Sequence, residues 1–401
     1  MSGSAAECRM VVKILLCHSH YQIRAGECLV VSSEADLLRA HGHQVVEFFR
    51  NNTAIRAMSL PQKLLLLFRG INNRRAAREI TEIIQREKPD IAHVHNVFPL
   101  ISPSIYRAIK RQNVPIVQTI HNFRFLCLNG LLFINNAPCH RCVHHSFMPG
   151  ILRRCLRHSL PYSLWYAVIL TWHRWRGTFL NSISQFIVLN SFTRAIFVDA
   201  GFPAARIQVK PNAAAVDTAA CTDTPERHAL FIGRFSPEKG LPTLLRAAEQ
   251  APYLPIKIIG SGPLEEQLRA QVQRRNLTQI EFLGSRSPEE CNRFMAQALV
   301  TVFPSECYEN CPLTVINSLA LGTPVIAART GGVPDFVPDG KHVGWLFTPG
   351  NADELAERLR WIADHIDEVI ALRPAVRAWG RKQFSAETNY ERLMAIYRSA
   401  E

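Results

Sequence analysis

The 401-residue sequence lacks a long unbroken hydrophobic run. Its longest apolar stretch, Leu160–Trp172, is interrupted by Pro161 and Ser163 and is shorter than the roughly 20 residues that a membrane-spanning helix needs. The first ten residues include Glu7 and Arg9 and have no apolar core of the kind found in signal peptides. We therefore expect neither a membrane span nor secretion, and we predict a cytoplasmic protein.

The cysteines do not form the pattern of a disulfide framework. Their number, eleven, is odd, and without secretion we expect reduced thiols. Repeats and low-complexity tracts are also absent. With 47% hydrophobic and 20% charged residues, the composition is that of a soluble globular protein, which excludes a disordered or coiled-coil chain.

Acidic residues are missing from one long segment. Between Asp90 and Asp199 there is no Asp or Glu, whereas 11 Lys or Arg and 8 His fall there. Residues 1–215 carry a formal charge of +16 and residues 216–401 a charge of −3. A basic half of this kind indicates an anionic partner. Because no nucleic-acid-binding motif is present, we do not expect that partner to be nucleic acid.

Short apolar strands alternate with helical patterns in both halves of the chain. In the first half we expect strands at 11–17, 44–49, 91–95, 115–120 and 185–189, and in the second half at 229–233, 256–260, 280–284, 299–303 and 324–327. This alternation predicts α/β architecture with two doubly wound, Rossmann-like domains. We place the first at 1–211, with a cysteine-rich and basic insertion at about 122–180, and the second at 225–385.

Three segments of the second half combine features of an anion site. In the segment 231–240, Arg234 and Lys239 follow the end of an expected strand. The segment 259–263, which contains Gly262, is a second glycine-rich stretch at the end of a strand. In the third, Pro312 stands where a helix would begin, so the following amides would be free to face an anion. Two cations and these amides would suit a diphosphate without a bound metal.

Taken jointly, these segments resemble the retaining glycosyltransferases of the GT-B fold, specifically glycosyltransferase family 4. The resemblance extends over essentially the whole chain and also includes the runs 322–326 (GTPVI) and 331–335 (GGVPD). It implies two Rossmann-like domains facing across a cleft, with a C-terminal helix, 386–401, that packs on the first domain. It also implies that a hexosyl group passes from a nucleotide-diphosphate sugar, UDP- or GDP-linked, to a glycan or lipid-linked acceptor, without a catalytic cofactor. Surface polysaccharide biosynthesis at the inner face of the cytoplasmic membrane is the setting that the resemblance favours.

The resemblance also implies roles for individual residues. The counterparts of Arg234 and Lys239 hold the diphosphate, and the first glutamate of a Glu-x7-Glu motif, here Glu309, contacts the donor sugar. Asn317 stands in place of the second glutamate, so we expect a weaker contact with the nucleotide, because the charge-assisted bond is lost. His121 follows a strand and is the candidate on the acceptor side. The catalytic set is therefore Glu309, His121, Arg234 and Lys239, and the further donor-binding candidates are Gly26, Gly233, Gly262, Asn310, Cys311, Leu313 and Thr314.

Gly26, His93 and His95 each depart from a simple assignment. Relatives usually carry two glycines before Glu27, whereas this chain has Ala25 and then Gly26, so only Gly26 would let the backbone approach a phosphate closely. His93 and His95 lie within an expected strand, and strand alternation alone would account for their burial.

Two features of the insertion point beyond the cleft. Cys127, Cys139, Cys142 and Cys155 have the number and spacing of a structural zinc site, with free buried cysteines as the alternative. The segment 150–176 combines arginines with three tryptophans, which is typical of a helix lying on an anionic membrane surface. A core helix with a solvated arginine face is the alternative there.

Other functions remain open at this point. The substitution at Asn317 is compatible with a catalytically silent sugar-nucleotide-binding protein, and the net charge of +13 with a polyanion-binding protein. A nucleotide-sugar epimerase would share the fold but would need only one bound substrate. The anion-site residues lie in the less basic half of the chain, which argues against the polyanion-binding protein, and we favour the transferase that the resemblance implies.

Overall fold

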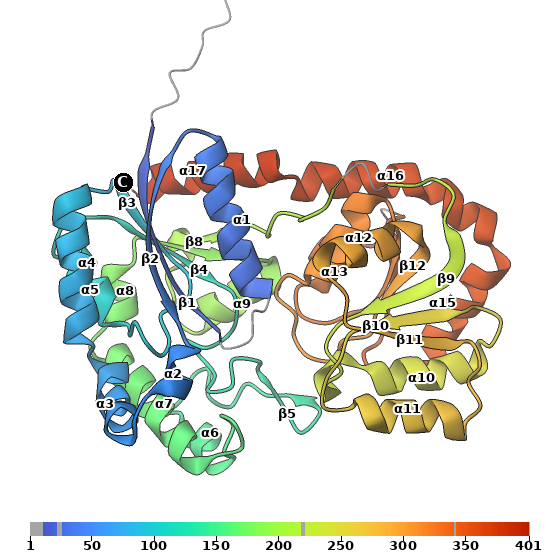
Figure 1. The fold of residues 1–401 in the computed structure, drawn as a ribbon, viewed down its shortest axis with the longest axis horizontal. Helices are drawn as coiled ribbons and strands as arrows, with labels where there is room; N and C mark the ends of the chain where they lie inside the picture. The colour runs from blue at the N-terminus through green and yellow to red at the C-terminus, as the bar shows by residue number, and fades with distance from the viewer. Residues whose placement is uncertain (1–10, 22–25, 218–220, 341, 401) are drawn as a thin grey trace, which may run out of the picture.

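In the computed structural model, two parallel six-stranded sheets stand next to each other, and helices cover both faces of each (Figure 1). The structure describes residues 11–21, 26–217, 221–340 and 342–400. Ala25 lies outside these ranges. The two α/β domains and their parallel sheets confirm the predicted fold class.

The first sheet has the strand order β2-β1-β3-β4-β7-β8, and all of its pairs are parallel. The strands are β1 (Lys13–His20), β2 (Gln44–Asn51), β3 (Ile91–Val94), β4 (Ile116–Ile120), β7 (Gln185–Val188) and β8 (Ile207–Val209). Because helices cover both faces, β3, β4 and β7 are buried along their whole length. The strand β8 is short and was not among the predicted strands.

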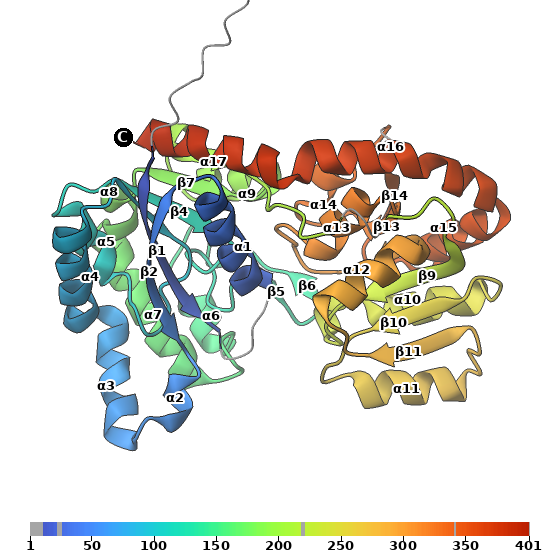
Figure 2. The ribbon, with the colours of Figure 1, turned by 45° about the horizontal axis from the view of Figure 1, so that its top comes forward.

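Helices from both ends of the chain cover the first sheet. They are α1 (Gly26–Ala40), α4 (Arg74–Glu87), α5 (Ser104–Lys110), α8 (Thr178–Ser182), α9 (Ser191–Asp199) and α17 (Ala386–Ala400). Leu393 and Tyr397 of α17 pack against Ile14, Ile91 and Val117 on one face of the sheet. The predicted return of a C-terminal helix to the first domain is thereby confirmed, and Figure 2 shows α16 and α17 running along both domains.

The second sheet has the order β11-β10-β9-β12-β13-β14, the strand order of the Rossmann fold. Its strands are β9 (Glu226–Ile232), β10 (Ile256–Ile259), β11 (Ile280–Gly284), β12 (Ala298–Phe303), β13 (Val325–Ala328) and β14 (Gly344–Phe347). Its helices are α10 (Leu241–Gln250), α11 (Glu265–Arg274), α12 (Pro288–Gln297), α13 (Leu313–Leu321), α14 (Val333–Phe336), α15 (Ala352–Asp364) and α16 (Ile366–Phe384). Of the six strands, only β14 was not predicted.

Two helical segments extend the first domain on the side away from α17. The first contains α2 (Ala54–Ala57) and α3 (Leu60–Ile71), and the second contains the hairpin of β5 (Phe133–Ile134) and β6 (Ala137–Pro138) followed by α6 (Met148–Leu152) and α7 (Leu160–Trp175). The helices α3 and α7 are in contact, because the indole Nε1 of Trp165 donates to Leu67 O at 2.8 Å. Among the described residues, none of the helices combines the length and hydropathy that crossing a membrane requires.

Candidate active site

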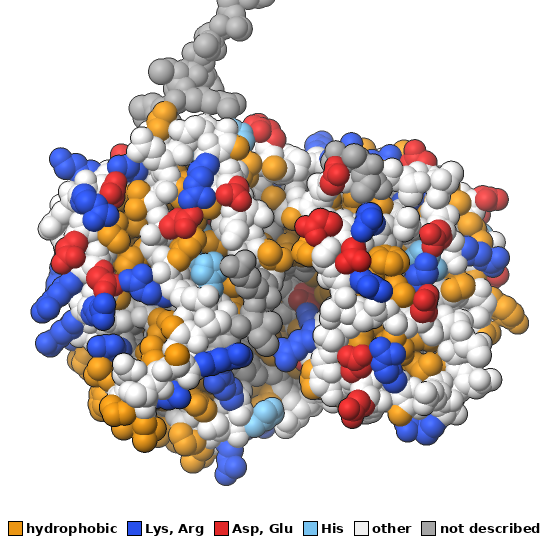
Figure 3. All heavy atoms as spheres, viewed as in Figure 1, with side chains coloured by type: hydrophobic (Ala, Val, Ile, Leu, Met, Phe, Trp, Pro, Cys, Tyr) orange, Lys and Arg blue, Asp and Glu red, His pale blue; other side chains and the backbone are white. Residues whose placement is uncertain are grey.

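A cleft of about 380 Å³ lies between the two domains, lined by residues from both. Figure 3 shows the molecule hollowed at this place. Its walls include ten of the residues expected to bind or act on the donor or acceptor: Gly26, His121, Gly233, Arg234, Lys239, Glu309, Asn310, Cys311, Leu313 and Thr314. Each domain contributes the carboxyl ends of its strands, which is where ligands of such sheets bind.

Arg234 and Lys239 follow β9 and line the cleft, but they differ in their exposure and in their ion pairing. Arg234 is exposed, and within the part of the chain that the structure describes its guanidinium has no ion-pair partner. Lys239 lies at the end of a short 3-10 turn whose following residue, Gly240, has φ of +69°. A Cβ at Gly240 would stand 1.8 Å from Pro304 O, so the turn that presents Lys239 requires glycine there.

Lys239 and Glu309 form an ion pair in the cleft. The ammonium Nζ lies 2.6 Å from Glu309 Oε1, which also accepts from the Ser305 hydroxyl at 2.6 Å. Burial alone would raise the pKa of Glu309, but Lys239 and the two hydrogen bonds outweigh it and hold that pKa below its usual value. Burial acts against the charged form of Lys239 too, yet Glu309 raises the pKa of the ammonium above its usual value. Both groups are therefore charged at neutral pH.

Two helix N-termini face each other across the cleft. The helix α13 begins at Leu313, directly after Pro312, and no side chain among the described residues caps it, so its first amides are available to bind an anion. On the opposite wall, α1 begins at Gly26. A Cβ at Gly26 would lie 3.3 Å from Leu313 Cδ1, which shows how closely the two helix starts approach.

On the wall of the first domain, His121 ends a buried chain of titratable groups. Its Nε2 lies 2.9 Å from Nδ1 of His95, whose own Nε2 is 3.4 Å from Glu34 Oε1. The other oxygen of Glu34 accepts from Lys210 at 3.1 Å. Burial, and secondly the neighbouring His95, keep the pKa of His121 well below its usual value, while burial lowers that of His95 to about 4. Both imidazoles are thus neutral at neutral pH.

His93 and His95 are both buried, as strand alternation predicts, but His95 contacts the candidate residue His121 directly. Burial alone would raise the pKa of Glu34, but Lys210 and His93 hold it well below the usual range. The carboxylate is therefore ionised beneath the two histidines, where it keeps the chain oriented.

Glu27 and Arg124 were not predicted as site residues. Glu27 lines both the main cleft and a smaller adjoining cavity of about 20 Å³, which Arg124 also lines. The Glu27 carboxylate accepts from the Tyr21 hydroxyl at 2.7 Å, and burial raises its pKa. Their positions next to Gly26 and within the segment after β4 are the sequence signals that could have identified them.

Asn310, directly after Glu309, connects the two domains. Its Nδ2 donates to His121 O at 2.8 Å and its Oδ1 accepts from the Thr193 hydroxyl at 2.8 Å. Its side-chain amide is therefore bonded to the first domain, whereas the sequence suggested donor binding.

The GGVPD run makes a second connection between the domains. The Asp335 carboxylate accepts from the amide and the hydroxyl of Ser191 at the start of α9. Gly332 lies so close to Asn190 that a Cβ there would stand 2.3 Å from Asn190 Cγ. The motif thus joins the domains beside the cleft.

Gly262 and Asn317 are not among the described residues that line the cleft. Gly262 packs against the backbone of Phe235, since a Cβ there would lie 2.5 Å from Phe235 O, so it supports the loop that carries Arg234. Asn317 faces the linker between the domains, where its Oδ1 accepts from Ala215 N at 3.0 Å.

Clusters of potential metal ligands lie outside the donor wall. Among the described residues, two groups have ligand atoms within 4.8 Å of one another: His18, His20 and Cys28, and Glu34, His93 and His95. In the second group the Lys210 ammonium already neutralises the carboxylate. The four cysteines of the insertion line a separate small cavity.

Two Rossmann-like domains that face each other across a cleft, with cations and a free helix start on one wall, define the GT-B class. Sequence comparison specifies the family. Residues 30–218 match the model of "Glycosyltransferase Family 4" and residues 221–373 that of "Glycosyl transferases group 1". The chain belongs to the group 1 glycosyltransferases, and its first half is of the family 4 type, as the resemblance indicated.

Curated relatives agree with this assignment. An uncharacterized glycosyltransferase of Methanocaldococcus jannaschii is 32% identical over 41% of this chain and 45% of its own length. The O-antigen chain mannosyltransferase C of Escherichia coli is 32% identical over 32% of this chain and 35% of its own. The matches thus span less than half of these relatives.

Solved structures match over nearly the whole chain. The Anabaena protein HepE in complex with UDP has a TM-score of 0.66 at 19% identity, covering 96% of this chain and 100% of that one. The sucrose-phosphate synthase of Thermosynechococcus elongatus has a TM-score of 0.70 at 18% identity, covering 96% and 98%. At this level of identity the likeness establishes the fold.

Proposed function

We propose that this protein is a retaining glycosyltransferase that transfers a sugar from a nucleotide-diphosphate sugar to a glycan or lipid-linked acceptor in surface polysaccharide biosynthesis. The observation that carries the proposal is the convergence of Arg234, Lys239 and the start of α13 on one wall of the cleft, with His121 on the opposite wall. Relatives in O-antigen synthesis and a neighbour solved with UDP-glucose support the substrate class.

The donor wall supplies what departure of a diphosphate requires. As the bond between the anomeric carbon and the phosphate oxygen breaks, negative charge grows on the diphosphate. Arg234, Lys239 and the free amides of α13 stabilise that charge, an electrostatic contribution that is usually the largest in catalysis. These groups supply the positive charge, so no metal is needed in the proposed step.

Retention follows in this proposal from attack on the face that the diphosphate leaves. The acceptor oxygen bonds to the anomeric carbon, and its proton passes to the departing phosphate oxygen. Glu309 is already engaged by Lys239 and Ser305, and Glu27 by Tyr21, so neither carboxylate is a free nucleophile for a covalent intermediate. Neutral His121 orients the reacting groups by hydrogen bonding.

The test is a panel of UDP-, GDP- and ADP-sugars scored by thermal shift and by sugar release. We expect one nucleotide to raise the melting temperature and its sugar to be turned over. Arg234→Met should weaken binding about 10- to 100-fold, the equivalent of a charge-assisted contact. Arg227→Met is the matched control, because Arg227 is an exposed arginine at the other end of β9. Binding without turnover by any donor would favour the silent binder instead.

We further propose that one face of the first domain lies on an anionic membrane. On α3, the side chains of Leu60, Leu64 and Phe68 are 72%, 54% and 72% exposed, and on α7 that of Trp175 is 75% exposed. Figure 3 shows this apolar patch at the lower left, with basic side chains around it. The sequence pointed to the segment with α6 and α7; the packing of α3 beside α7 adds the exposed apolar side chains of α3 to this surface.

The charge around this patch supports a lipid partner. No acid occurs between Glu47 and Glu79 or between Asp90 and Asp199, so both helical segments are purely basic. Exposed apolar side chains ringed by Lys and Arg fit an anionic bilayer, with the rings and leucines in the interface and the cations at the headgroups. A lipid-linked acceptor would reach the cleft from such a surface.

Co-sedimentation with phosphatidylcholine vesicles, with and without phosphatidylglycerol, tests this proposal. We expect pelleting with the anionic vesicles only, and its loss in high salt. Phe68→Ser should lower the partition coefficient about tenfold, whereas Tyr253→Ser, at an exposed aromatic residue of the other domain (79% exposed), should not. Failure to pellet with anionic vesicles at low salt would contradict the proposal and leave the transferase assignment untouched.

A further inference from the structure

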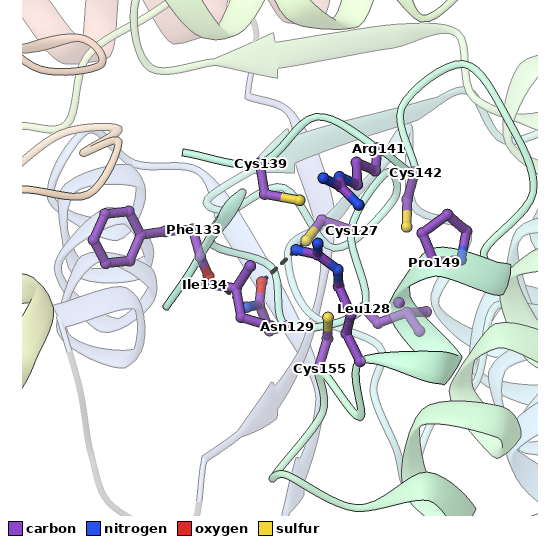
Figure 4. A pocket seen from close by; sticks show the side chains of 12 residues that line it. Cys127, Leu128, Asn129, Phe133, Ile134, Cys139, Arg141, Cys142, Pro149 and Cys155 are labelled. Atoms are coloured by element: carbon purple, nitrogen blue, oxygen red, sulfur yellow. Dashed lines mark hydrogen bonds between the residues drawn. The ribbon is translucent and has the colours of Figure 1, made fainter. Parts of the chain in front are cut away.

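The insertion between β4 and β7 contains a small cavity of about 10 Å³ whose walls include Cys127, Cys139, Cys142 and Cys155. These cysteines come from the turn after β4, the loop after β6 and the turn after α6. Figure 4 shows their sulfur atoms directed toward a shared space. We propose that the four thiols bind one structural zinc ion as thiolates.

The size of the cavity favours a single ion. About 10 Å³ is the space of one water-sized sphere, too small for an iron–sulfur cluster. Four sulfur ligands arranged around one ion are typical of structural zinc, which is held in a closed tetrahedral site without an open position. The ten cysteines that the structure describes are all free, so no disulfide competes for these four.

Backbone groups favour the thiolate form of two of the cysteines. The backbone of Leu132, Asn129 and Gly130 acts against burial on the pKa of the Cys127 thiol, and that of Gly150 does so for Cys142. A Cβ at Gly150 would lie 3.3 Å from Cys142 Sγ and 2.8 Å from Leu128 Cδ1, so the backbone there lies close to the Cys142 sulfur. Amide donors around sulfur stabilise the thiolate form and are typical outer partners of metal ligands.

The basic character of the insertion matches the charge of such a site. Zinc with four thiolates carries a net charge of −2, and Arg141 and Arg153 line the same cavity. Arg174 adds a cation near Cys142 and lies over the Phe147 ring at 4.7 Å. Since the insertion contains no Asp or Glu, the thiolates are the anions that these arginines can neutralise.

Zinc binding requires a small inward rotation of the thiols. Among the described residues, the groups whose ligand atoms all lie within 4.8 Å of one another include no three of these cysteines. Zinc–sulfur bonds of about 2.3 Å place the sulfurs of a tetrahedral site about 3.8 Å apart. The proposal therefore requires that the cysteine side chains rotate about their Cα–Cβ bonds and bring the sulfurs together as zinc binds.

Protons must leave the thiols as zinc binds. Zinc binds the thiolate form of cysteine, so zinc affinity should fall as the pH is lowered.

The zinc would fix a contact between the domains. Between Cys139 and Cys142 lies His140, whose Nε2 is 3.1 Å from the Tyr308 hydroxyl of the second domain. Tyr308 directly precedes Glu309 in the sequence. A rigid zinc knuckle would thus hold His140 against the segment that carries the donor-wall carboxylate, without touching the substrate.

Metal analysis of protein purified without chelators tests the proposal. We expect about one zinc per chain, its loss in Cys139→Ser/Cys142→Ser, and its retention in the control Cys221→Ser/Cys291→Ser, whose cysteines are partly exposed and lie in the other domain. If the first variant does not fold, cobalt substitution in the unaltered protein replaces it. Tetrahedral thiolate cobalt gives intense visible bands and a sulfur-to-cobalt charge-transfer band.

Each outcome either supports or overturns the zinc site. Zinc at about one equivalent, or the cobalt thiolate spectrum, supports the site. Less than about a tenth of an equivalent of zinc together with a cobalt spectrum lacking the charge-transfer band would overturn it, and so would iron with acid-labile sulfide. None of these readouts depends on a sugar nucleotide, so the result is independent of the proposed transferase activity.

Discussion

Replacing Lys239 by methionine tests the electrostatics of the donor wall most directly. Lys239 and Glu309 are 27% and 14% exposed, and they are 2.6 Å apart. The variant leaves the Glu309 carboxylate largely out of water with the Ser305 hydroxyl and the Cys307 thiol as its remaining partners. Removing one member of a fully buried pair costs about 3–5 kcal/mol. For this partly exposed pair we predict a loss of about 2–3 kcal/mol in the free energy of unfolding at neutral pH.

The pH dependence follows from the Glu309 pKa. In the unaltered protein Lys239 holds that pKa below its usual value, so ionised Glu309 stabilises the fold above its unfolded pKa, and this contribution is lost as the pH falls. Without Lys239, burial acts unopposed, and the folded pKa rises above the unfolded one. The variant is then penalised above the unfolded pKa but not below it. The stability difference should therefore be largest at neutral pH and shrink in acid.

Urea unfolding at a series of pH values measures this difference. Lys257→Met is the matched control: Lys257 is 23% exposed, but its partner Glu226 is 53% exposed, so the loss should stay below about 1 kcal/mol. A Lys239→Met penalty that matched the control, or that did not change between neutral and acid pH, would refute the reasoning.

Three further predictions concern the inner wall, the nucleotide and the domain contact. Glu34→Gln should lower the free energy of unfolding in urea by about 3–5 kcal/mol, because it leaves the buried Lys210 ammonium without a charged partner. Adding Lys210→Met should recover much of that loss. Independent, additive losses would contradict the pairing. Asn317→Glu should lower the dissociation constant of the nucleotide in titration calorimetry if this side chain leaves Ala215 N and turns to the nucleotide on binding, because the glutamate then supplies a charge-assisted bond; an unchanged or higher value would refute the weakened contact. Asn310→Ala removes two hydrogen bonds between the domains, worth about 1–3 kcal/mol together, and should increase the radius of gyration in X-ray scattering without ligand; an unchanged radius would show that other contacts keep the cleft closed.

The fold was predictable because its signals are local. Every strand predicted at the centre of the two sheets is a short apolar run buried on both faces, and such runs are readable without tertiary information. The strands β8 and β14 were not predicted, because they are three and four residues long and only partly buried. Pro312 likewise marked the start of α13 correctly, because proline at a helix start acts through its own missing N–H.

Side-chain partners could not be predicted, because they depend on elements far apart in sequence. Asn310 stands within the expected donor motif, yet its amide bonds Thr193, 117 residues away. His95 had the pattern of a buried strand residue, and its contact with His121 depends on the pairing of β3 with β4. The exposed apolar face of α3 could not be predicted, because it depends on the contact of this helix with α7.

The position of α17 bears on how the chain is made. The first domain emerges first from the ribosome, but three of its buried polar groups find partners on the last helix: His93 on Tyr397, His43 on Tyr390 and Lys210 on Asn389. One face of its sheet is covered by that helix as well. Domains usually fold in the order of their synthesis. Here the first domain can complete its core only after α17 has been synthesised, so we expect its folding to wait for the second domain, with one apolar face of its sheet lacking α17 until then.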